Sequence, residues 1–168
     1  NPRRTQVVAH GVKEFSAEDL IPDEQTIVIV TRDNYIKRVA PDTFRTQARG
    51  GKGVMGLETK EEDVVEHLFS TNTHADLLFF TNRGRVFKLK AYEVPAASRT
   101  AKGQALVNFL QLAPQEKVTA ILSLKDLSGS GYKYLVMVTR KGLIKKTDIG
   151  DFEVVRRSGL IAIKLKDE

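Results

Sequence analysis

Three stretches of the chain share one pattern of apolar and polar positions. They are IVIVTRDNYIKR at 27–38, LLFFTNRGRVFK at 77–88 and LVMVTRKGLIKK at 135–146. Each has four apolar residues, a threonine, two polar residues, Asn or Gly, and then apolar residues near Lys or Arg. Short apolar runs bounded by turn residues are typical of buried β-strands, and Asn and Gly accept the positive φ of two-residue hairpin turns. Each stretch is therefore predicted to be a β-hairpin.

The hairpins belong to a longer repeat. Their threonines stand at 31, 81 and 139. Arg49, Lys52 and Gly53 of a glycine-rich basic segment, QARGGKG at 47–53, recur 50 residues later within SRTAKGQ at 98–104, and a fainter copy is RRSG at 156–159. Apolar stretches follow these segments at 54–57, 105–110 and 160–163, and again at 64–70 and 118–124. About four strands in about 50 residues is the period of a propeller blade.

We therefore expect an all-β fold: a partial, propeller-like assembly of four-stranded blades that bury their faces against one another. Residues 1–25 are predicted to be a lead-in that could supply a swapped strand. Residues 26–75 and 76–131 form the first and second repeats, and 132–168 an incomplete third. The expected chain order within a repeat is hairpin, basic loop, strand, loop, strand. Helix is expected only as a turn at SAED (16–19), which has a capping-box pattern before Pro22.

Composition narrows the classes of function. The chain has 168 residues, no cysteine, 27 Lys and Arg against 21 Asp and Glu, and a net charge of +6. The lack of cysteine excludes disulfides and thiolate zinc sites and fits a reducing cytoplasm. No apolar run reaches the roughly 20 residues of a membrane helix. The basic balance favours a polyanionic partner, and the first residue, Asn1, indicates a segment of a longer protein.

Motifs for catalysis or cofactors are weak. GKGVMG at 51–56 matches the letters of a dinucleotide-binding fingerprint, but the strand and helix that should flank that motif are not predicted here. Ser70, His74 and Asp76 lie close in sequence without a nucleophile elbow. His10, His67 and His74 have no metal-ligand spacing. We expect no catalytic residue, no metal, no cofactor and no small-molecule substrate for this segment.

The basic residues instead indicate binding to duplex DNA. Glycines let a backbone approach an anion, and Arg or Lys adds charge-assisted hydrogen bonds to phosphate. Cations at equivalent positions of successive blades would form a curved belt that binds phosphates without reading sequence. The candidate rim residues are Arg32, Lys37, Arg38, Arg45, Arg83, Arg85, Lys88, Lys90, Arg99, Lys102, Arg140, Lys141, Lys145, Lys146, Arg156 and Arg157. A protein-interaction propeller, an RNA-binding domain and an enzyme acting through this segment alone remain alternatives.

The chain resembles the C-terminal DNA-wrapping domain of the DNA gyrase A family. QARGGKG resembles that family's GyrA-box, which Gln47, Arg49, Gly50, Gly51, Lys52 and Gly53 match and from which Ala48 departs. NTHAD at 72–76, FFTNRGRVFKLKAYEVPAASRT at 79–100 and GLIAIKL at 159–165 also resemble the family. The A-type subunit of topoisomerase IV is a close relative whose box is usually degraded or absent.

The resemblance implies a β-pinwheel, a propeller-shaped ring of about six blades with its own strand swap, of which this chain would carry about three. It implies that the box and the basic rim wrap duplex DNA, so that the enzyme introduces negative supercoils. It also implies that the segment assembles with the rest of the gyrase A protein and with the gyrase B protein into an A2B2 holoenzyme, which binds ATP and Mg outside this segment. The holoenzyme would lie in the bacterial cytoplasm, at the nucleoid. The alternative that it implies is a topoisomerase IV domain that guides decatenation.

Overall fold

The described structure consists of strands and short 3-10 turns. It is a computed structural model that describes residues 17–44, 63–125, 127, 129 and 131–165. The strands are β1 (Gln25–Thr31), β2 (Tyr35–Val39), β3 (Val65–Asn72), β4 (Asp76–Thr81), β5 (Arg85–Lys90), β6 (Gln104–Ala105), β7 (Val118–Leu124), β8 (Tyr134–Val138), β9 (Ile144–Asp148) and β10 (Leu160–Ile161). The 3-10 turns are η1 (Ala17–Leu20), η2 (Pro41–Thr43), η3 (Ala91–Glu93), η4 (Leu106–Asn108) and η5 (Ile149–Phe152). The all-β fold predicted from the sequence is confirmed.

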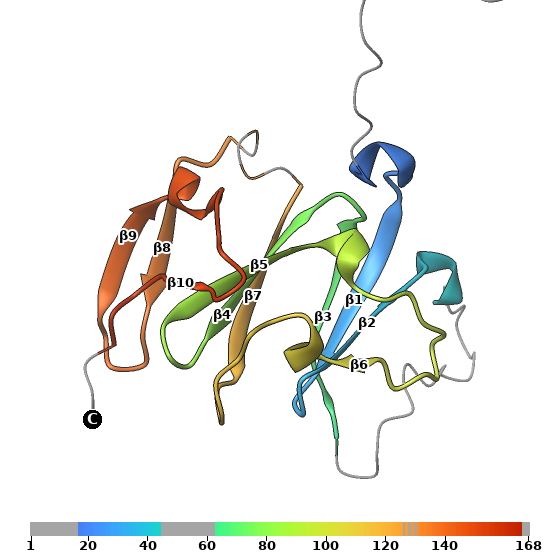
Figure 1. Cartoon of the computed structure of the whole chain (residues 1–168), viewed down its shortest axis with the longest axis horizontal. Helices are drawn as coiled ribbons and strands as arrows, with labels where there is room; N and C mark the ends of the chain where they lie inside the picture. The colour runs from blue at the N-terminus through green and yellow to red at the C-terminus, as the bar shows by residue number, and fades with distance from the viewer. Residues whose placement is uncertain (1–16, 45–62, 126, 128, 130, 166–168) are drawn as a thin grey trace, which may run out of the picture.

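The strands form three antiparallel sheets that stand side by side (Figure 1). The strand order is β3-β1-β2-β6 in the first sheet and β10-β5-β4-β7 in the second, and the third consists of β8 and β9. All three predicted hairpins are present, as β1–β2, β4–β5 and β8–β9. The apolar runs at 64–70 and 118–124 form the strands that pair with β1 and β4.

The short edge strand of each four-stranded sheet comes from the following repeat. β6 belongs to the second repeat in sequence but pairs with β2 of the first sheet, with Ile36 opposite Gln104. β10 belongs to the third repeat but pairs with β5 of the second sheet, with Val86 opposite Leu160. In the part of the chain that the structure describes, the strand after the second basic segment and the strand after the third each complete the preceding sheet. The predicted boundaries near 75 and 131 separate the repeats in sequence but do not separate the sheets.

Neighbouring sheets share apolar cores. One core joins Val28, Val30 and Ile36 of the first sheet to Leu77 and Phe79 of the second. A second core packs the other side of the second sheet against the β8–β9 hairpin and η5, and it contains Leu78, Val86, Leu124, Ile149 and Phe152. Burying one such side chain contributes about 1.5–3 kcal/mol. Because consecutive residues of β4 point to opposite faces of the second sheet, Phe79 packs against the first sheet and Leu78 packs against the third hairpin.

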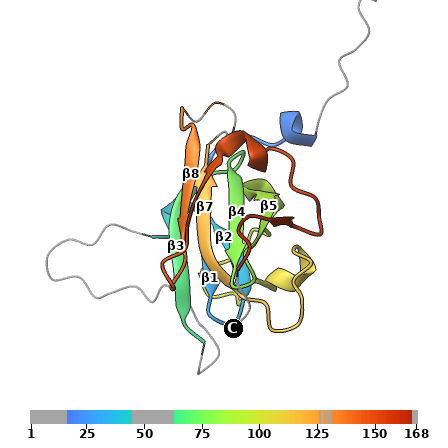
Figure 2. The same cartoon turned by 90° about the vertical axis from the view of Figure 1, so that its left-hand side faces the viewer.

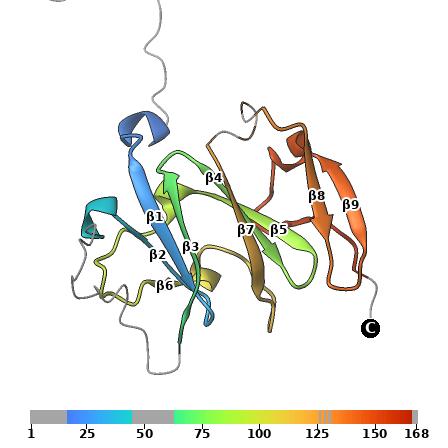
Figure 3. The ribbon, with the colours of Figure 1, turned by 180° about the vertical axis from the view of Figure 1, so that it is seen from behind.

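Two edges of the assembly face opposite ways (Figure 2). β3 and β7 form one side, where they lie next to each other and the hydroxyls of Thr71 and Ser123 are 2.6 Å apart (Figure 3). The short strand β10 and the turn η4 lie on the other side. The basic loops that precede β6 and β10 accordingly run along the side away from β3 and β7.

Candidate nucleic-acid interface

The three hairpin turns have the same geometry. Thr31, Thr81 and Thr139 each accept through Oγ1 a hydrogen bond from the backbone N–H four residues later, at 3.2, 3.3 and 3.0 Å. Their carbonyls accept from the N–H of Asn34, Gly84 and Gly142 at 3.0, 3.0 and 2.9 Å. The repeat seen in the sequence is therefore a repeat of hydrogen bonds.

The positive-φ residue is the third residue of each turn. The φ angles are 61° at Asn34, 71° at Gly84 and 78° at Gly142. The sequence correctly places the positive φ, but it predicts two-residue turns, whereas three residues separate the paired strands of the first two hairpins. Three-residue loops with a left-handed third residue are a common hairpin type.

The turns bring cations to one end of the molecule. All three turns lie at the lower side of Figure 1. Arg32, Arg83, Arg140 and Lys141 occupy the positions between the threonine and the positive-φ residue, and all four are exposed. The first turn also carries Asp33, whose backbone N–H donates to buried Asp63 at 3.1 Å. The formal charge of the turns thus rises from the first hairpin to the third.

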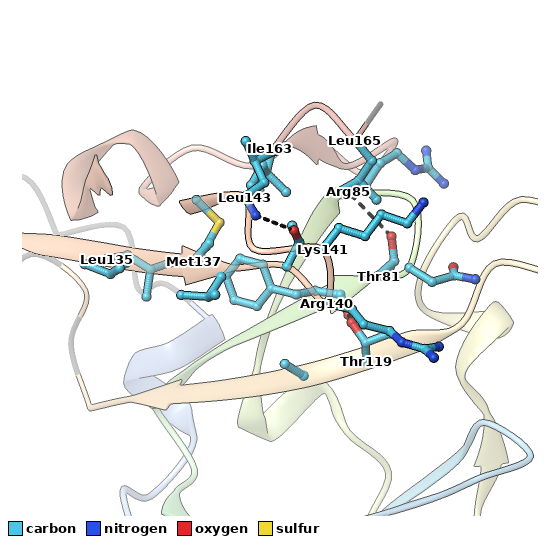
Figure 4. A pocket seen from close by; sticks show the side chains of 18 of the residues that line it. Thr81, Arg85, Thr119, Leu135, Met137, Arg140, Lys141, Leu143, Ile163 and Leu165 are labelled. Atoms are coloured by element: carbon cyan, nitrogen blue, oxygen red, sulfur yellow. Dashed lines mark hydrogen bonds between the residues drawn. The ribbon is translucent and has the colours of Figure 1, made fainter. Parts of the chain in front are cut away.

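An apolar cleft lies between the second and third turns. It has a volume of about 1210 Å³. Leu135, Met137 and Leu143 of the third hairpin line it, together with Thr119 of β7 and Ile163 after β10 (Figure 4). No aspartate or glutamate of the described residues lines it. Arg85, Arg140 and Lys141 are among the residues that line the cleft, and no acidic group among the described lining residues would oppose an anion there.

Arg85 is held in a network with a buried carboxylate. Its Nε lies 2.9 Å from Glu116 Oε1 and its Nη2 contacts Glu116 Oε2, while Thr81 Oγ1 donates to the same carboxylate at 2.6 Å. Burial alone would raise the pKa of Glu116, but these hydrogen bonds outweigh it and lower the pKa to about 2. The hydrogen bond to Glu116 raises the pKa of Arg85. Arg85 therefore clamps the loop before β7 to the second hairpin.

Lys88 and Lys90 also have internal partners. Lys90 Nζ is 3.5 Å from Asp76 and 3.2 Å from Glu18, and Lys88 Nζ contacts the Glu153 carbonyl and lies 3.9 Å from Asp76. Burial alone would lower the pKa of Lys90, but the two carboxylates outweigh it and raise the pKa. Lys90 thus connects β4 and β5 to η1, Lys88 connects them to the segment after η5, and both charges are partly neutralised there.

Lys37 is not on the rim. The sequence predicts it as a DNA contact, but its side chain is 1% exposed. Its Nζ donates to the carbonyls of Ser98, Arg99 and Ala101 at 3.2, 2.5 and 2.6 Å. Burial lowers the pKa of this ammonium group. The loop that contains these carbonyls crosses the Lys37 side chain and excludes water from it, so the prediction for this residue is wrong.

Two predicted cations are half-buried at the loop 98–103: Lys102, which belongs to the loop, and Arg38, which lies on β2. Lys102 Nζ lies 3.8 Å from the centre of the Tyr35 ring, an arrangement of cation and aromatic face that contributes about 0.5–1 kcal/mol at a surface. Arg38 Nε donates to the Val94 carbonyl at 3.2 Å, next to the start of this loop. The first hairpin and the second basic segment therefore lie together, although Lys37 and Ser98 are 61 residues apart in sequence.

The third hairpin presents more exposed charge. Lys145 Nζ donates to the Ala162 carbonyl at 2.6 Å, and Lys146 Nζ lies 3.8 Å from the centre of the Tyr134 ring. Arg156 and Arg157, in the faint third copy of the basic segment, are exposed. With the turn residues, these side chains are the predicted rim cations most accessible to a ligand.

The predicted box lies outside the described residues. Gln47, Arg49, Gly50, Gly51, Lys52 and Gly53, and also Arg45, remain predictions from the sequence. One exposed cation beside the second turn, Lys117, is missing from the predicted set. Its backbone N–H donates to Asn82 Oδ1 at 2.9 Å. No sequence pattern signals it, because Val64 occupies the equivalent position before β3.

A family model described as the DNA gyrase C-terminal domain, a β-propeller, matches this chain in three segments, 25–72, 75–125 and 133–168. The chain is 47% identical over 165 residues to the A subunit of the DNA gyrase of Clostridium acetobutylicum, covering 98% of this chain and 20% of the relative. It is 46% identical over 166 residues to that of a Nocardioides species, covering 99% and 18%. The chain thus spans about a fifth of the length of these relatives.

Solved structures show the same fold. The C-terminal domain of DNA topoisomerase IV superposes with a TM-score of 0.70 at 27% identity, over 88% of this chain and 44% of that one. A DNA gyrase A C-terminal domain gives 0.67 at 28% identity, over 86% and 45%. Within the described residues, no helix is long and apolar enough to cross a membrane. The matched segments coincide with the three hairpin repeats, and the chain belongs to the DNA gyrase C-terminal domain family of β-propellers.

Proposed function

We propose that this chain binds duplex DNA through its phosphates, without reading sequence, and bends it along a basic rim. The observation that carries the proposal is the hairpin turn that recurs at one end of three adjacent sheets and carries the exposed residues Arg32, Arg83, Arg140 and Lys141. The proposal is that the row of turns follows the curve of the phosphates of a bent duplex. The box residues at 47–53 and the exposed cations of the third hairpin would extend the same contact.

Electrostatics can supply the energy for bending. Duplex DNA has a persistence length of about 150 base pairs, so a tight bend over a short site costs several kcal/mol. Each phosphate that a Lys or Arg neutralises releases counterions, and that release offsets the cost. Phosphate contacts carry no sequence information, so the wrapped DNA can have any sequence.

Within a gyrase, such wrapping would impose a handed crossing on the DNA and allow strand passage elsewhere to introduce negative supercoils. The whole protein would then act with the remainder of gyrase A and with gyrase B in an A2B2 assembly. ATP, Mg and the catalytic residues would belong to those other parts. This function places the protein in the bacterial cytoplasm, at the nucleoid. The family match and the likeness to the gyrase A relatives support this assignment.

The salt dependence of duplex binding tests the proposal. About six phosphate contacts predict that log K falls against log salt with a slope of about −5. The double variant Arg83→Ala/Arg140→Ala should reduce the slope by about 2, equally for unrelated DNA sequences. The matched control is Lys125→Ala/Lys133→Ala, which removes the same charge from the connection between β7 and β8, at the end opposite the turns (Figure 1). A nearly salt-independent affinity would contradict the proposal.

A role in topoisomerase IV, guiding decatenation, is the second candidate, and the superposition on a topoisomerase IV domain favours it. The two roles differ in outcome for the whole enzyme: gyrase supercoils relaxed circles in the presence of ATP, whereas topoisomerase IV relaxes and decatenates without supercoiling them. A third candidate is a propeller that binds other proteins. It predicts that a pull-down with this chain recovers the same protein partner before and after nuclease treatment.

A further inference from the structure

The second basic segment is held against the first sheet at both of its ends. The N–H of Arg38 donates to the Pro95 carbonyl and the N–H of Ala97 donates to the Arg38 carbonyl, both at 2.9 Å. The chain is therefore paired with β2 just before the loop begins. It leaves the loop by pairing with β2 again, where Gln104 lies opposite Ile36. Residues 98–103 form the loop that connects these two paired segments. On β2, Lys37 lies between Ile36 and Arg38, the two residues that make the contacts.

Gly103 fixes the point where the loop returns to the strand. Its φ is +85°, and a Cβ at this position would lie 2.5 Å from the Ile36 carbonyl oxygen. A side chain therefore does not fit without moving the backbone. The close approach allows the loop to cover the Lys37 side chain completely.

The buried ammonium group sets the direction of the loop's peptides. Lys37 Nζ donates hydrogen bonds to the carbonyl oxygens of Ser98, Arg99 and Ala101, so these three carbonyls point toward Lys37. None of the described peptide bonds is cis, and in a trans peptide the C=O and the following N–H point in opposite directions. The N–H groups of Arg99, Thr100 and Lys102 are therefore directed away from Lys37. Within the described residues, these three N–H groups have no hydrogen-bond partner.

The charges around the loop have one sign. Lys37 lies beneath it, and Arg99 and Lys102, both half-buried, belong to the loop itself. No carboxylate of the described residues forms an ion pair with any of the three. In the second sheet, Phe87 takes the position of Lys37, and a Cβ at Gly159 would lie 2.9 Å from its ring. The basic loop of the third repeat thus has no equivalent ammonium group beneath it.

We propose that residues 98–103 form an anion-binding loop that takes a backbone phosphate of duplex DNA, and that the buried Lys37 is the positioning residue that holds the loop in its binding shape. Outward-facing backbone N–H groups without a partner, next to cationic side chains, can donate hydrogen bonds to a phosphate. Arg99 and Lys102 would contact the phosphate directly. Lys37 acts through the loop's carbonyls and does not reach the DNA. This inference rests on the proposed function and adds a defined second contact to the predicted box.

The test measures the slope of log K against log salt for a short duplex, using the full-length protein in its natural assembly. Arg99→Ala/Lys102→Ala should reduce the slope by about 1, since the contact with one phosphate is lost. Lys37→Met, which keeps an unbranched side chain one atom shorter and removes its charge, should reduce the slope by a similar amount. The triple variant should lose no more than the double variant, because both changes remove the same contact. Lys125→Ala/Lys133→Ala should leave the slope unchanged.

A second readout follows the loop itself. Hydrogen exchange of the peptide that contains residues 98–103 should slow when duplex DNA is added to the unaltered protein, and less so when inorganic phosphate is added. In Lys37→Met the same peptide should exchange faster without DNA, and DNA should no longer slow it. Unchanged exchange in the strands of the first sheet shows that the variant is folded; if it is not, the Arg99/Lys102 variant decides whether the site exists.

The outcomes separate this inference from the proposed function. If the unaltered protein binds duplex DNA without salt dependence, the proposed function fails, and this inference fails with it. If the unaltered protein shows a steep slope but Arg99→Ala/Lys102→Ala behaves like the control, only the phosphate site is overturned. If that variant loses slope while folded Lys37→Met retains it, the positioning role of Lys37 is overturned.

Discussion

At the scale of single residues, the chain uses its cations in different ways. Lys37 holds a loop, Arg85 holds a carboxylate, and Arg140 is exposed at a turn. The sequence identifies all three as basic residues beside a turn, because their spacing from the threonine is local information. It does not reveal that Glu116, 31 residues after Arg85, is the partner of that arginine. Pairing is decided by the fold, and so the sequence overestimates the number of accessible cations.

The buried carboxylate of Glu116 predicts a dependence of stability on pH. Its pKa in the folded chain is about 2, below the ordinary value of 4.5. The ionised group therefore stabilises the fold fully above about pH 4.5, and this contribution is lost as the pH falls through 2. Glu116→Gln should lower the free energy of unfolding at pH 7 by about 2–3 kcal/mol, because Arg85 loses its charged partner. Denaturant unfolding at pH 7 and pH 3 measures both effects.

The matched control for that experiment is Glu66→Gln, at an exposed position on β3. It should change the unfolding free energy by less than about 0.5 kcal/mol. The difference in stability between Glu116→Gln and the unaltered chain should be smaller at pH 3 than at pH 7. An equal difference at the two pH values would show that the ionised carboxylate does not stabilise the fold.

At the scale of elements, the hairpins were predictable and the shared edge strands were not. A hairpin is specified by its own apolar run and turn residues. The partner of β6 lies one repeat earlier in the chain, and no local pattern identifies it. The stretch ALVNFL at 105–110 was expected to be a strand, but only its first residue, Ala105, belongs to β6, and η4 follows, with Leu106 buried and Val107 exposed. Its apolar character reflects burial in the core between the sheets, where a 3-10 turn is as suitable as a strand.

Two glycines at equivalent turn positions test the edge strand that closes the second sheet. Gly84 and Gly142 have nearly equal φ, +71° and +78°. A Cβ at Gly84 would lie 2.1 Å from the Ile163 carbonyl oxygen, whereas a Cβ at Gly142 would have no heavy atom within 4 Å. Gly142→Ala should cost about 1–2 kcal/mol from backbone strain alone. Gly84→Ala should cost at least about 3 kcal/mol, since it also displaces the hydrogen bonds from Ala162 and Ile163 to Gly84.

Chemical denaturation of the two alanine variants measures these costs side by side. A similar loss of stability in both would mean that the segment after β10 does not pack on the second hairpin as the structure has it. Because the two positions share their backbone conformation, the difference between them isolates the contact from the strain.

At the scale of the whole molecule, the central claim is that matched turns of adjacent sheets form one rim that a double helix follows. The recurrence of the turn could be inferred from the sequence, since Thr31, Thr81 and Thr139 mark it. The arrangement of the turns at one end could not, because it depends on how the sheets pack through residues such as Phe79 and Leu78 on opposite faces of β4. The structure supplies that packing, and with it the argument for wrapping instead of simple binding.

The most direct test of wrapping is topological. The full-length protein is bound to nicked circular DNA, the nick is ligated, and the linking number of the circles is compared with that of circles ligated without protein. A wrapped duplex predicts a change of one sign that grows with the protein added and shrinks in Arg83→Ala/Arg140→Ala but not in Lys125→Ala/Lys133→Ala. Tight binding with an unchanged linking number would contradict the claim, since DNA that only touches the rim leaves the topology of the circle as it was.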